Sequence, residues 1–171
     1  MDPRLLCGQT APDFSLHDLK NNLHQLSNYQ GRITVLNFWS AECPWVERTD
    51  REITLAMSKW GPEVVLLTIA SNPNEPVELL RTISKARGLP VVLHDSEQLV
   101  ADSYGAQTTP HVFVIDRQGG LRYQGAVDDV TFRKRTPGEN YLEQAVDALL
   151  AGRTLDKDAN PPYGCAIVRY T

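Results

Sequence analysis

The sequence predicts an α/β fold built on a mixed central sheet with helices on both faces. Two continuous apolar runs, at residues 33–39 and 64–70, are rich in β-branched residues and are typical of strands covered on both sides. Segments with helical periodicity follow both runs, and this alternation predicts parallel strands joined by right-handed crossovers. Two further strand-like segments, at 111–115 and 121–126, are separated by a short turn and predict an antiparallel pair.

The other elements follow from turn and cap signals, taken in chain order. Alternating residues around Lys20-Asn21-Asn22 predict an N-terminal β-hairpin over 14–26, and a short strand is expected at 91–94. Helices are expected at 44–60, 77–87, 96–104 and 139–151, and a glycine follows each of them. Ser96 is the expected cap of the third helix. Residues 1–12 are expected to be an irregular lead-in. The chain thus divides into one domain at 1–152 and an irregular C-terminal tail at 153–171, which packs on the same domain.

Composition excludes several classes of function. The formal net charge is −4 and no basic run interrupts the sequence, which argues against a nucleic-acid partner. No apolar run approaches the roughly 20 residues of a membrane-spanning helix, and the N-terminal residues lack the apolar core of a signal peptide. We therefore expect a cytoplasmic protein without a membrane partner. Its three cysteines are too few and too scattered for a disulfide scaffold.

The most informative feature is Cys43, which the first buried strand delivers to the start of a helix. Pro44 suits the first helical position, where its missing N–H would be unpaired anyway. We expect Cys43 to be the N-cap, with the N–H groups of Trp45 and Val46 aimed at its sulfur. The helix dipole would then lower the thiol pKa from about 8.5 towards roughly 3.5–7.5. The alternative is a small, buried, apolar cysteine without chemistry.

Several motifs carry a family resemblance. Residues 37–43, NFWSAEC, resemble the strand-to-active-site segment of thioredoxin-fold proteins, closest to bacterial thiol–disulfide oxidoreductases of the cytochrome-maturation type. Residues 11–16, APDFSL, look like the N-terminal signature of redoxins, the alkyl hydroperoxide reductase/thiol-specific antioxidant superfamily. CPWV at 43–46, DRQGG at 116–120 and GCAI at 164–167 look most like peroxiredoxin-like redoxins with a Cys-Pro-Tyr-Val type of active site. The resemblance covers essentially the whole chain.

The resemblance implies a thioredoxin-like fold and roles for residues around Cys43. Thr109-Pro110 stands where that fold places a cis-proline loop beside the reactive cysteine, and the Thr109 backbone would be free to pair with an extended substrate. Ser40 holds the place of a peroxiredoxin threonine and could hydrogen-bond the thiol. Trp39 is expected in the core, and Trp45 at the surface beside the sulfur, where it would shape partner docking.

The sequence also departs from these families. Val46 stands where thioredoxin-like disulfide reductases have their second cysteine, so no local disulfide can form. Asn37 replaces the proton-relay aspartate of thioredoxins, and Pro110 stands where peroxiredoxins have an arginine. Efficient peroxide reduction would therefore need another arginine near the thiol, and the candidates are Arg48, Arg117 and Arg122.

These observations predict an antioxidant-type thiol oxidoreductase that starts thiol–disulfide exchange or peroxide reduction with Cys43. A second thiol must resolve the product, and Cys165 in the tail is the candidate, although it could equally be a free cysteine. Cys7 is expected to be a bystander. The expected partners are a disulfide or peroxide and a thiol reductant such as thioredoxin or a small thiol, with no cofactor or metal. Two alternatives remain: a redox-silent protein-binding module, and a metal site formed by Cys43, Cys165, His94 and His111.

Overall fold

The computed structural model describes residues 5–169, so residues 1–4 of the expected lead-in lie outside it. The elements of the body of the chain are β1 (Ser15–His17), β2 (Leu23–Gln25), β3 (Ile33–Trp39), α1 (Pro44–Trp60), β4 (Val64–Ala70), α2 (Val77–Ala86), β5 (Val92–His94), α3 (Leu99–Tyr104), β6 (Thr108–Thr109), β7 (His111–Ile115), β8 (Leu121–Gly125) and α4 (Tyr141–Leu150). The tail adds β9 (Ala159–Asn160) and β10 (Cys165–Ala166). Two short 3-10 helices, η1 (Leu26–Tyr29) and η2 (Gly61–Glu63), connect elements.

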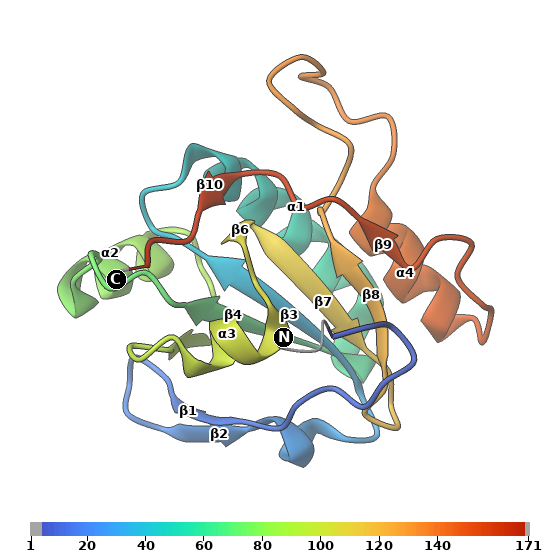
Figure 1. Ribbon diagram of the computed structural model, residues 1–171, viewed down its shortest axis with the longest axis horizontal. Helices are drawn as coiled ribbons and strands as arrows, with labels where there is room; N and C mark the ends of the chain where they lie inside the picture. The colour runs from blue at the N-terminus through green and yellow to red at the C-terminus, as the bar shows by residue number, and fades with distance from the viewer. Residues whose placement is uncertain (1–4, 170–171) are drawn as a thin grey trace.

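The central sheet has six strands in the order β5-β4-β3-β7-β8-β9, as Figure 1 shows. Strand β3 lies at its centre, parallel to β4 and antiparallel to β7. The predicted mixed sheet and the antiparallel β7–β8 pair are therefore confirmed. Strands β1 and β2 form the predicted hairpin as a separate two-stranded sheet.

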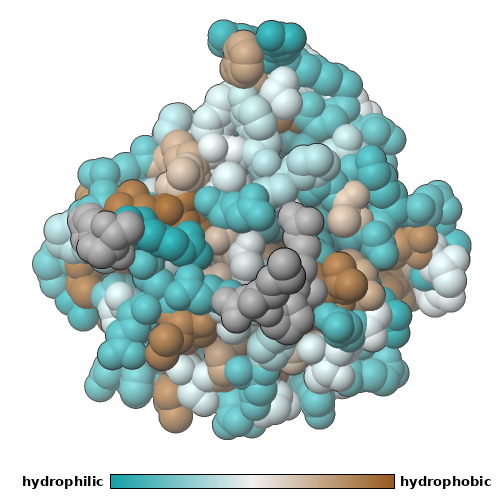
Figure 2. Space-filling model, in the orientation of Figure 1, coloured by the Kyte–Doolittle hydropathy of each residue, from teal (hydrophilic) through white to brown (hydrophobic). Residues whose placement is uncertain are grey.

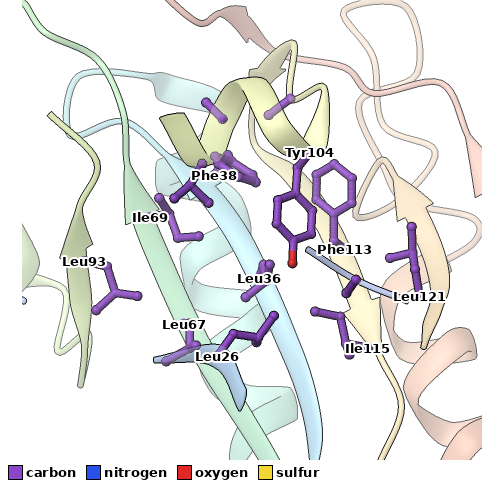
Figure 3. Packing of buried hydrophobic residues seen from close by; sticks show 14 of the residues in the cluster. Leu26, Leu36, Phe38, Leu67, Ile69, Leu93, Tyr104, Phe113, Ile115 and Leu121 are labelled. Atoms are coloured by element: carbon purple, nitrogen blue, oxygen red, sulfur yellow. The ribbon is translucent and has the colours of Figure 1, made fainter. Parts of the chain in front are cut away.

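Both faces of the sheet are covered, because side chains of a strand alternate between its two faces. Leu36 and Phe38 of β3 point to one face and pack with Tyr104 of α3, as Figure 3 shows. Ile33 and Val35 point to the other face and pack on residues of α1 and α4. Strand β3, whose end leads to Cys43, is therefore fully buried.

The tail is not irregular throughout, so that expectation was wrong. Strand β9 extends the central sheet by pairing in parallel with β8, and β10 pairs antiparallel with β6. Each of these tail strands has two residues, which is too short to produce a readable apolar alternation. These strands form by hydrogen bonding to the backbones of β8 and β6, which are distant in the sequence. The tail sequence alone therefore does not indicate them.

Helix α3 begins later than predicted, at Leu99, and Ser96 is not its cap. The residue before the helix, Gln98, has a left-handed backbone with φ of 60°. The carboxylate of Asp95 instead accepts the N–H groups of Val100 and Ala101, at 3.2 and 2.9 Å. A buried aspartate thus satisfies helix N–H groups that a capping serine would otherwise take.

The outer surface is largely polar. On the face drawn in Figure 2, apolar residues form separate patches among hydrophilic ones. Among the described residues, the large apolar side chains that are exposed are Leu6, Leu23, Leu55, Leu99 and Phe132. Within residues 5–169, no helix combines the length and the apolar character needed to cross a membrane.

Candidate active site

Cys43 lies where β3 leads into α1, and it is the N-cap residue of that helix with Pro44 at the first helical position. The N–H groups of Val46 and Glu47 both donate to the Cys43 carbonyl oxygen, at 3.2 Å. The Cys43 sulfur accepts no hydrogen bond from the helix, so the expectation that backbone N–H groups point at it was wrong. The reason is the side-chain direction, because the sulfur turns away from the helix towards the loop before β7.

The Cys43 sulfur faces two groups from distant parts of the chain. It lies 3.2 Å from the carbonyl oxygen of Thr109 and 2.7 Å from the sulfur of Cys165. The Thr109–Pro110 peptide bond beside it is cis. The three cysteines are free thiols in this structure, and Cys43 itself is 3% exposed. Cys165 and the Thr109 loop therefore cover the sulfur that the sequence singles out.

The pairing of β10 with β6 brings the two sulfurs together. Cys165 is the register partner of Thr109, and Ala166 is the partner of Thr108. Cys43 and Cys165 are 122 positions apart in the chain, yet both sulfurs meet at the Thr109 carbonyl. Two thiols at this separation can become a disulfide by a small movement, without rearrangement of the fold.

Burial, followed by the hydrogen bond and the charge of Cys43, raises the pKa of the Cys165 thiol to about 12. The carboxylate of Glu75 acts in the same direction. Cys165 therefore keeps its proton at neutral pH. A thiol has one hydrogen, so Cys165 can donate its hydrogen to the Cys43 sulfur while that sulfur lies against Thr109.

The loop that carries Cys43 is held by Glu75, a residue that the sequence analysis missed. Glu75 is 4% exposed, and its Oε2 accepts the Ser40 hydroxyl at 3.1 Å and the Glu42 N–H at 3.0 Å. Its Oε1 accepts the Asn72 amide at 3.5 Å. The Ser40 hydroxyl thus donates to Glu75 instead of the Cys43 sulfur. The only sequence signal was a polar loop rich in Asn and Pro.

Two tryptophans flank the site in different environments. Trp39 is fully buried at the end of β3, and its indole N–H donates to the Asp50 carboxylate at 2.9 Å. Arg87 joins this pair, since it donates to Asp50 at 3.0 Å and to the Ala41 carbonyl at 3.0 Å. Trp45 is half-buried and packs edge-to-face on Tyr163 of the tail, with ring centroids 5.0 Å apart. The tail therefore contacts the start of α1 at Trp45 as well as at Cys43.

The surroundings of His111 and of Cys7 differ from those of Cys43. His111 is buried, its Nδ1 accepts the Gln107 N–H at 3.2 Å, and burial lowers its pKa to about 4. It is therefore neutral and orders the loop before β7. The Cys7 sulfur lies 3.2 Å from the Asp158 carbonyl, and burial is the main cause that raises its pKa to about 11. Within residues 5–169, no three His, Cys, Asp or Glu side chains are grouped so that they could hold a metal ion.

The candidate arginines are engaged elsewhere. Arg48 forms a two-point ion pair with Asp128, at 2.8 and 2.9 Å. Arg122 pairs with Asp116 at 2.5 Å, and Arg117 lies 3.7 Å from Glu63. Within the described part of the chain, none of these three guanidinium groups hydrogen-bonds the Cys43 sulfur. None of the three therefore supplies a cation to the Cys43 sulfur, whose neighbours are the Cys165 sulfur and the Thr109 carbonyl.

Comparisons with known proteins identify relatives of this chain. Residues 7–124 match the family described as AhpC/TSA. The thiol-disulfide oxidoreductase ResA of Geobacillus kaustophilus is 35% identical over 120 residues, which cover 67% of this chain and 66% of ResA. The thiol:disulfide interchange protein DsbE of Escherichia coli is 27% identical over 126 residues, which cover 72% of this chain and 66% of DsbE. The chain thus spans just under two thirds of the length of these relatives.

Solved structures resemble the chain over almost its whole length. A hypothetical protein from Sinorhizobium meliloti 1021 has 31% identity and a TM-score of 0.84, and the match covers 96% of this chain and 95% of that chain. An uncharacterized conserved protein from Geobacillus kaustophilus has 29% identity and a TM-score of 0.88, with 96% and 93% covered. The fold described above, including most of its tail, is therefore similar to that of both proteins.

Proposed function

Because this chain belongs to the AhpC/TSA family, we propose that it is a thiol–disulfide oxidoreductase whose redox pair is Cys43 and Cys165. The observation that carries the proposal is the 2.7 Å separation of the two sulfurs at the Thr109 carbonyl. Cys165 takes the part that the second cysteine plays in a C-x-x-C motif, whose place Val46 occupies here. The names of the relatives ResA and DsbE support the same class of reaction.

In the proposed reaction, the Cys43 thiolate attacks one sulfur of a substrate disulfide and forms a mixed disulfide. The bond between the two substrate sulfurs breaks, and the other substrate sulfur leaves as a thiolate. The Cys165 thiol then passes its proton to this substrate thiolate, and its sulfur attacks the Cys43 sulfur. The bond to the substrate breaks, the remaining substrate sulfur leaves as a thiolate, and a Cys43–Cys165 disulfide forms. The substrate is reduced by two electrons and the protein is oxidised by two. A thiol reductant such as thioredoxin or a small thiol would reduce the protein again.

The roles of the surrounding residues are part of the proposal. Thr109 and Pro110 would hold the tail strand and the sulfurs in register, and Pro44 would start the helix beside them. Ser40 would fix the active-site loop through Glu75, while Trp39 supports that loop from the core. Trp45 would anchor the tail through Tyr163. A cytoplasmic location stays a prediction.

Peroxide reduction is the second candidate, favoured by the family name and by the Cys43–Pro44 start of α1. The same pair could serve it, because Cys165 could resolve a sulfenic acid on Cys43. The arginines, however, are paired with carboxylates away from the thiol. We therefore expect peroxide turnover to be slow relative to disulfide turnover.

The test compares the wild type with Cys43→Ser, Cys165→Ser and, as a matched control, Cys7→Ser. Each protein is assayed for reduction of a protein disulfide and of hydrogen peroxide, with dithiothreitol as the reductant. We expect Cys43→Ser to abolish turnover, Cys165→Ser to accumulate mixed disulfide on Cys43, and Cys7→Ser to match the wild type. Mass spectrometry of the oxidised wild type should find a Cys43–Cys165 crosslink. Oxidation of Cys43 alone, with no crosslink, would reject the proposed pair.

A further inference from the structure

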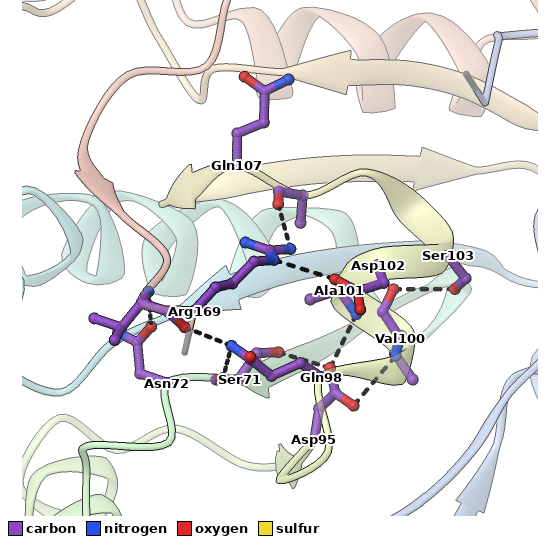
Figure 4. A network of polar contacts seen from close by, with 12 residues as sticks. Ser71, Asn72, Asp95, Gln98, Val100, Ala101, Asp102, Ser103, Gln107 and Arg169 are labelled. Atoms are coloured by element: carbon purple, nitrogen blue, oxygen red, sulfur yellow. Dashed lines mark hydrogen bonds and ion pairs between the residues drawn. The ribbon is translucent and has the colours of Figure 1, made fainter. Parts of the chain in front are cut away.

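Residues 165–168 of the tail lie extended against β6, Gln107, Asn72 and Gln98, and these residues form what we call the groove. Beyond the pairing of β10 with β6, the Ile167 N–H donates to the Gln107 carbonyl at 3.0 Å. The Val168 N–H donates to the Asn72 side chain at 2.9 Å, and the Gln98 amide donates to the Val168 carbonyl at 2.6 Å. Figure 4 shows the contacts of Asn72 and Gln98 together with those of Arg169, which reaches Asp102 and the Ala106 carbonyl. The groove therefore binds the backbone of residues 165–168.

The occupied groove closes the route to the reactive sulfur. Cys43 is 3% exposed, and the Cys165 sulfur lies directly against it. A disulfide in another protein therefore cannot reach Cys43 while residues 164–169 stay in place. A partner has to displace this segment, and a partner strand on the same path would hydrogen-bond the polar groups that the segment leaves.

We infer that this groove is a docking site for an extended, cysteine-bearing segment of a partner protein, and that it requires glycine immediately before the partner's cysteine. The inference rests on the proposed function, and it adds a sequence pattern for the partner segment. This segment competes with the chain's own tail for the groove. The pattern is Gly-Cys-x-apolar, which the tail itself presents as Gly164, Cys165, Ala166 and Ile167.

The requirement for glycine follows from the close approach of two backbones. A Cβ atom on Gly164 would lie 2.0 Å from the Thr109 carbonyl oxygen and 3.1 Å from the Pro110 ring. The contacted atoms belong to backbone and to a proline ring, so they cannot turn aside as a flexible side chain would. Any strand that follows the path of the tail meets the same obstacle one residue before its cysteine.

The preference for an apolar residue follows from strand alternation. Side chains two apart in a strand point the same way, so Cys165 and Ile167 both face inward while Ala166 is exposed. Ile167 is 6% exposed and packs into the core cluster that contains Ala106 and Val100. A partner strand that places its cysteine on Cys43 would put its own second residue after the cysteine into this pocket.

The partner segment and the tail occupy the groove in turn. With the tail displaced, the Cys43 thiolate attacks the partner's cysteine sulfur, and the partner's second sulfur leaves as a thiolate. The tail then pairs again with β6 and displaces the partner's backbone. Cys165 can then pass its proton to the partner thiolate that left first, attack the Cys43 sulfur and release the partner's remaining sulfur as a thiolate. Every bond that breaks is an S–S bond replaced by another, so electrons balance without a further reactant.

The test uses the full chain with Cys7→Ser and Cys165→Ser, so that Cys43 is the one reactive thiol. Two peptides, YGCAIVR and YACAIVR, carry thionitrobenzoate on their cysteine as a mixed disulfide. The rate of release of the coloured thionitrobenzoate anion measures attack by Cys43. We expect the glycine peptide to react at least about tenfold faster than the alanine peptide, because overpacking against backbone is costly. The mixed disulfide of mercaptoethanol and thionitrobenzoate serves as a small disulfide that needs no groove.

The outcomes separate this inference from the proposed function. Equal rates for the two peptides, with the small disulfide also reacting, would overturn the groove and leave the oxidoreductase proposal standing. No reaction of Cys43 with any of the three disulfides would overturn the oxidoreductase proposal. A disulfide-linked dimer after oxidation of the wild type would show that a second copy of the chain supplies the tail, and would overturn the partner proposal.

A variant of the groove gives an independent check. Gln98→Ala removes an amide that donates to both the Ser71 and the Val168 carbonyls, so the tail should open more often. We expect the small disulfide to react about tenfold faster with this variant. Gln124→Ala is the matched control, because its amide donates to the Leu5 carbonyl away from the tail strand β10. An unchanged rate in Gln98→Ala would contradict the competition between tail and partner.

Discussion

Cys43 and Cys7 have similar immediate contacts but different surroundings. Each sulfur lies 3.2 Å from a backbone carbonyl oxygen, that of Thr109 for Cys43 and that of Asp158 for Cys7. Asp158 and Cys165 both belong to the tail, so the tail contacts both cysteines. It presents a second sulfur to Cys43 and only a carbonyl oxygen to Cys7. A carbonyl contact therefore does not distinguish the proposed redox cysteine from Cys7, whereas the strand register that supplies a second thiol does.

The largest expected effect comes from moving that second thiol by one residue. The variant Cys165→Ser with Ala166→Cys shifts the cysteine along β10 to a position whose side chain is exposed. Since adjacent strand residues point to opposite faces, we expect the crosslink to Cys43 to be lost completely. Peptide mapping of the oxidised protein by mass spectrometry measures it, and Ala166→Ser is the control that keeps Cys165. An equally efficient crosslink from position 166 would mean that the register of β10 does not hold Cys165 in place.

Acid should weaken the loop that faces the tail. His111 has a folded-state pKa of about 4, below the value of about 6.5 for an unfolded chain, because burial disfavours its charged form. The unfolded state therefore binds a proton first as pH falls. The contribution of neutral, buried His111 to the free energy of unfolding is fully present above about pH 6.5. This contribution is lost towards pH 4, by on the order of 3 kcal/mol.

Urea unfolding at several pH values measures this loss. His111→Gln keeps an acceptor for the Gln107 N–H but cannot titrate, so its free energy of unfolding should change less over the same range. The control is His17→Gln, at an exposed position on β1. If His111→Gln loses stability with acid as steeply as the wild type, another group causes the loss.

Gly164→Ala should disturb the tail without touching either sulfur. The added methyl group would lie 2.0 Å from the Thr109 carbonyl, so the tail has to shift and Cys165 moves with it. We expect the Cys43–Cys165 crosslink to form about tenfold more slowly under limiting oxidant. Gly152→Ala is the control, since its φ of +72° also disfavours a side chain but its Cβ would meet nothing within 4 Å. Similar slowing in both variants would point to backbone strain instead of the contact with Thr109.

The same contrast explains what the sequence could predict. The bounds of β3, α1 and β4 were predicted to the residue, because continuous apolar runs and a Cys-Pro start are local signals. The positions of Cys43 and Pro44 at the start of α1 follow from those signals too. The direction of the Cys43 sulfur does not, because it is set by Thr109 and by a cysteine 122 positions away.

Polar residues buried by distant contacts were the other omission. Glu75 stands in a loop of Asn and Pro residues, where a carboxylate is most often exposed. It is buried because the Ser40 hydroxyl and the Glu42 N–H, in the loop between β3 and α1, donate hydrogen bonds to its carboxylate. Nothing in the order of residues 71–76 indicates those partners, so the family resemblance could suggest the cysteine site but not its support.

The smallest expected effect tests a single helix cap near the groove. Asp95 accepts the N–H groups of Val100 and Ala101 and the Ser71 hydroxyl, whereas Ser96, the residue that the sequence favoured, does not cap α3. We expect Asp95→Ala to lower the free energy of unfolding by about 1–2 kcal/mol, since caps of this kind contribute 0.5–2 kcal/mol. Ser96→Ala should change it by less than about 0.5 kcal/mol, as surface substitutions usually do. Helix α3 follows Gln98 and contains Asp102, and both residues contact the tail that covers Cys43. Asp95→Ala should therefore also speed alkylation of Cys43. Equal free energies of unfolding for Asp95→Ala and Ser96→Ala would indicate that Asp95 is not the cap.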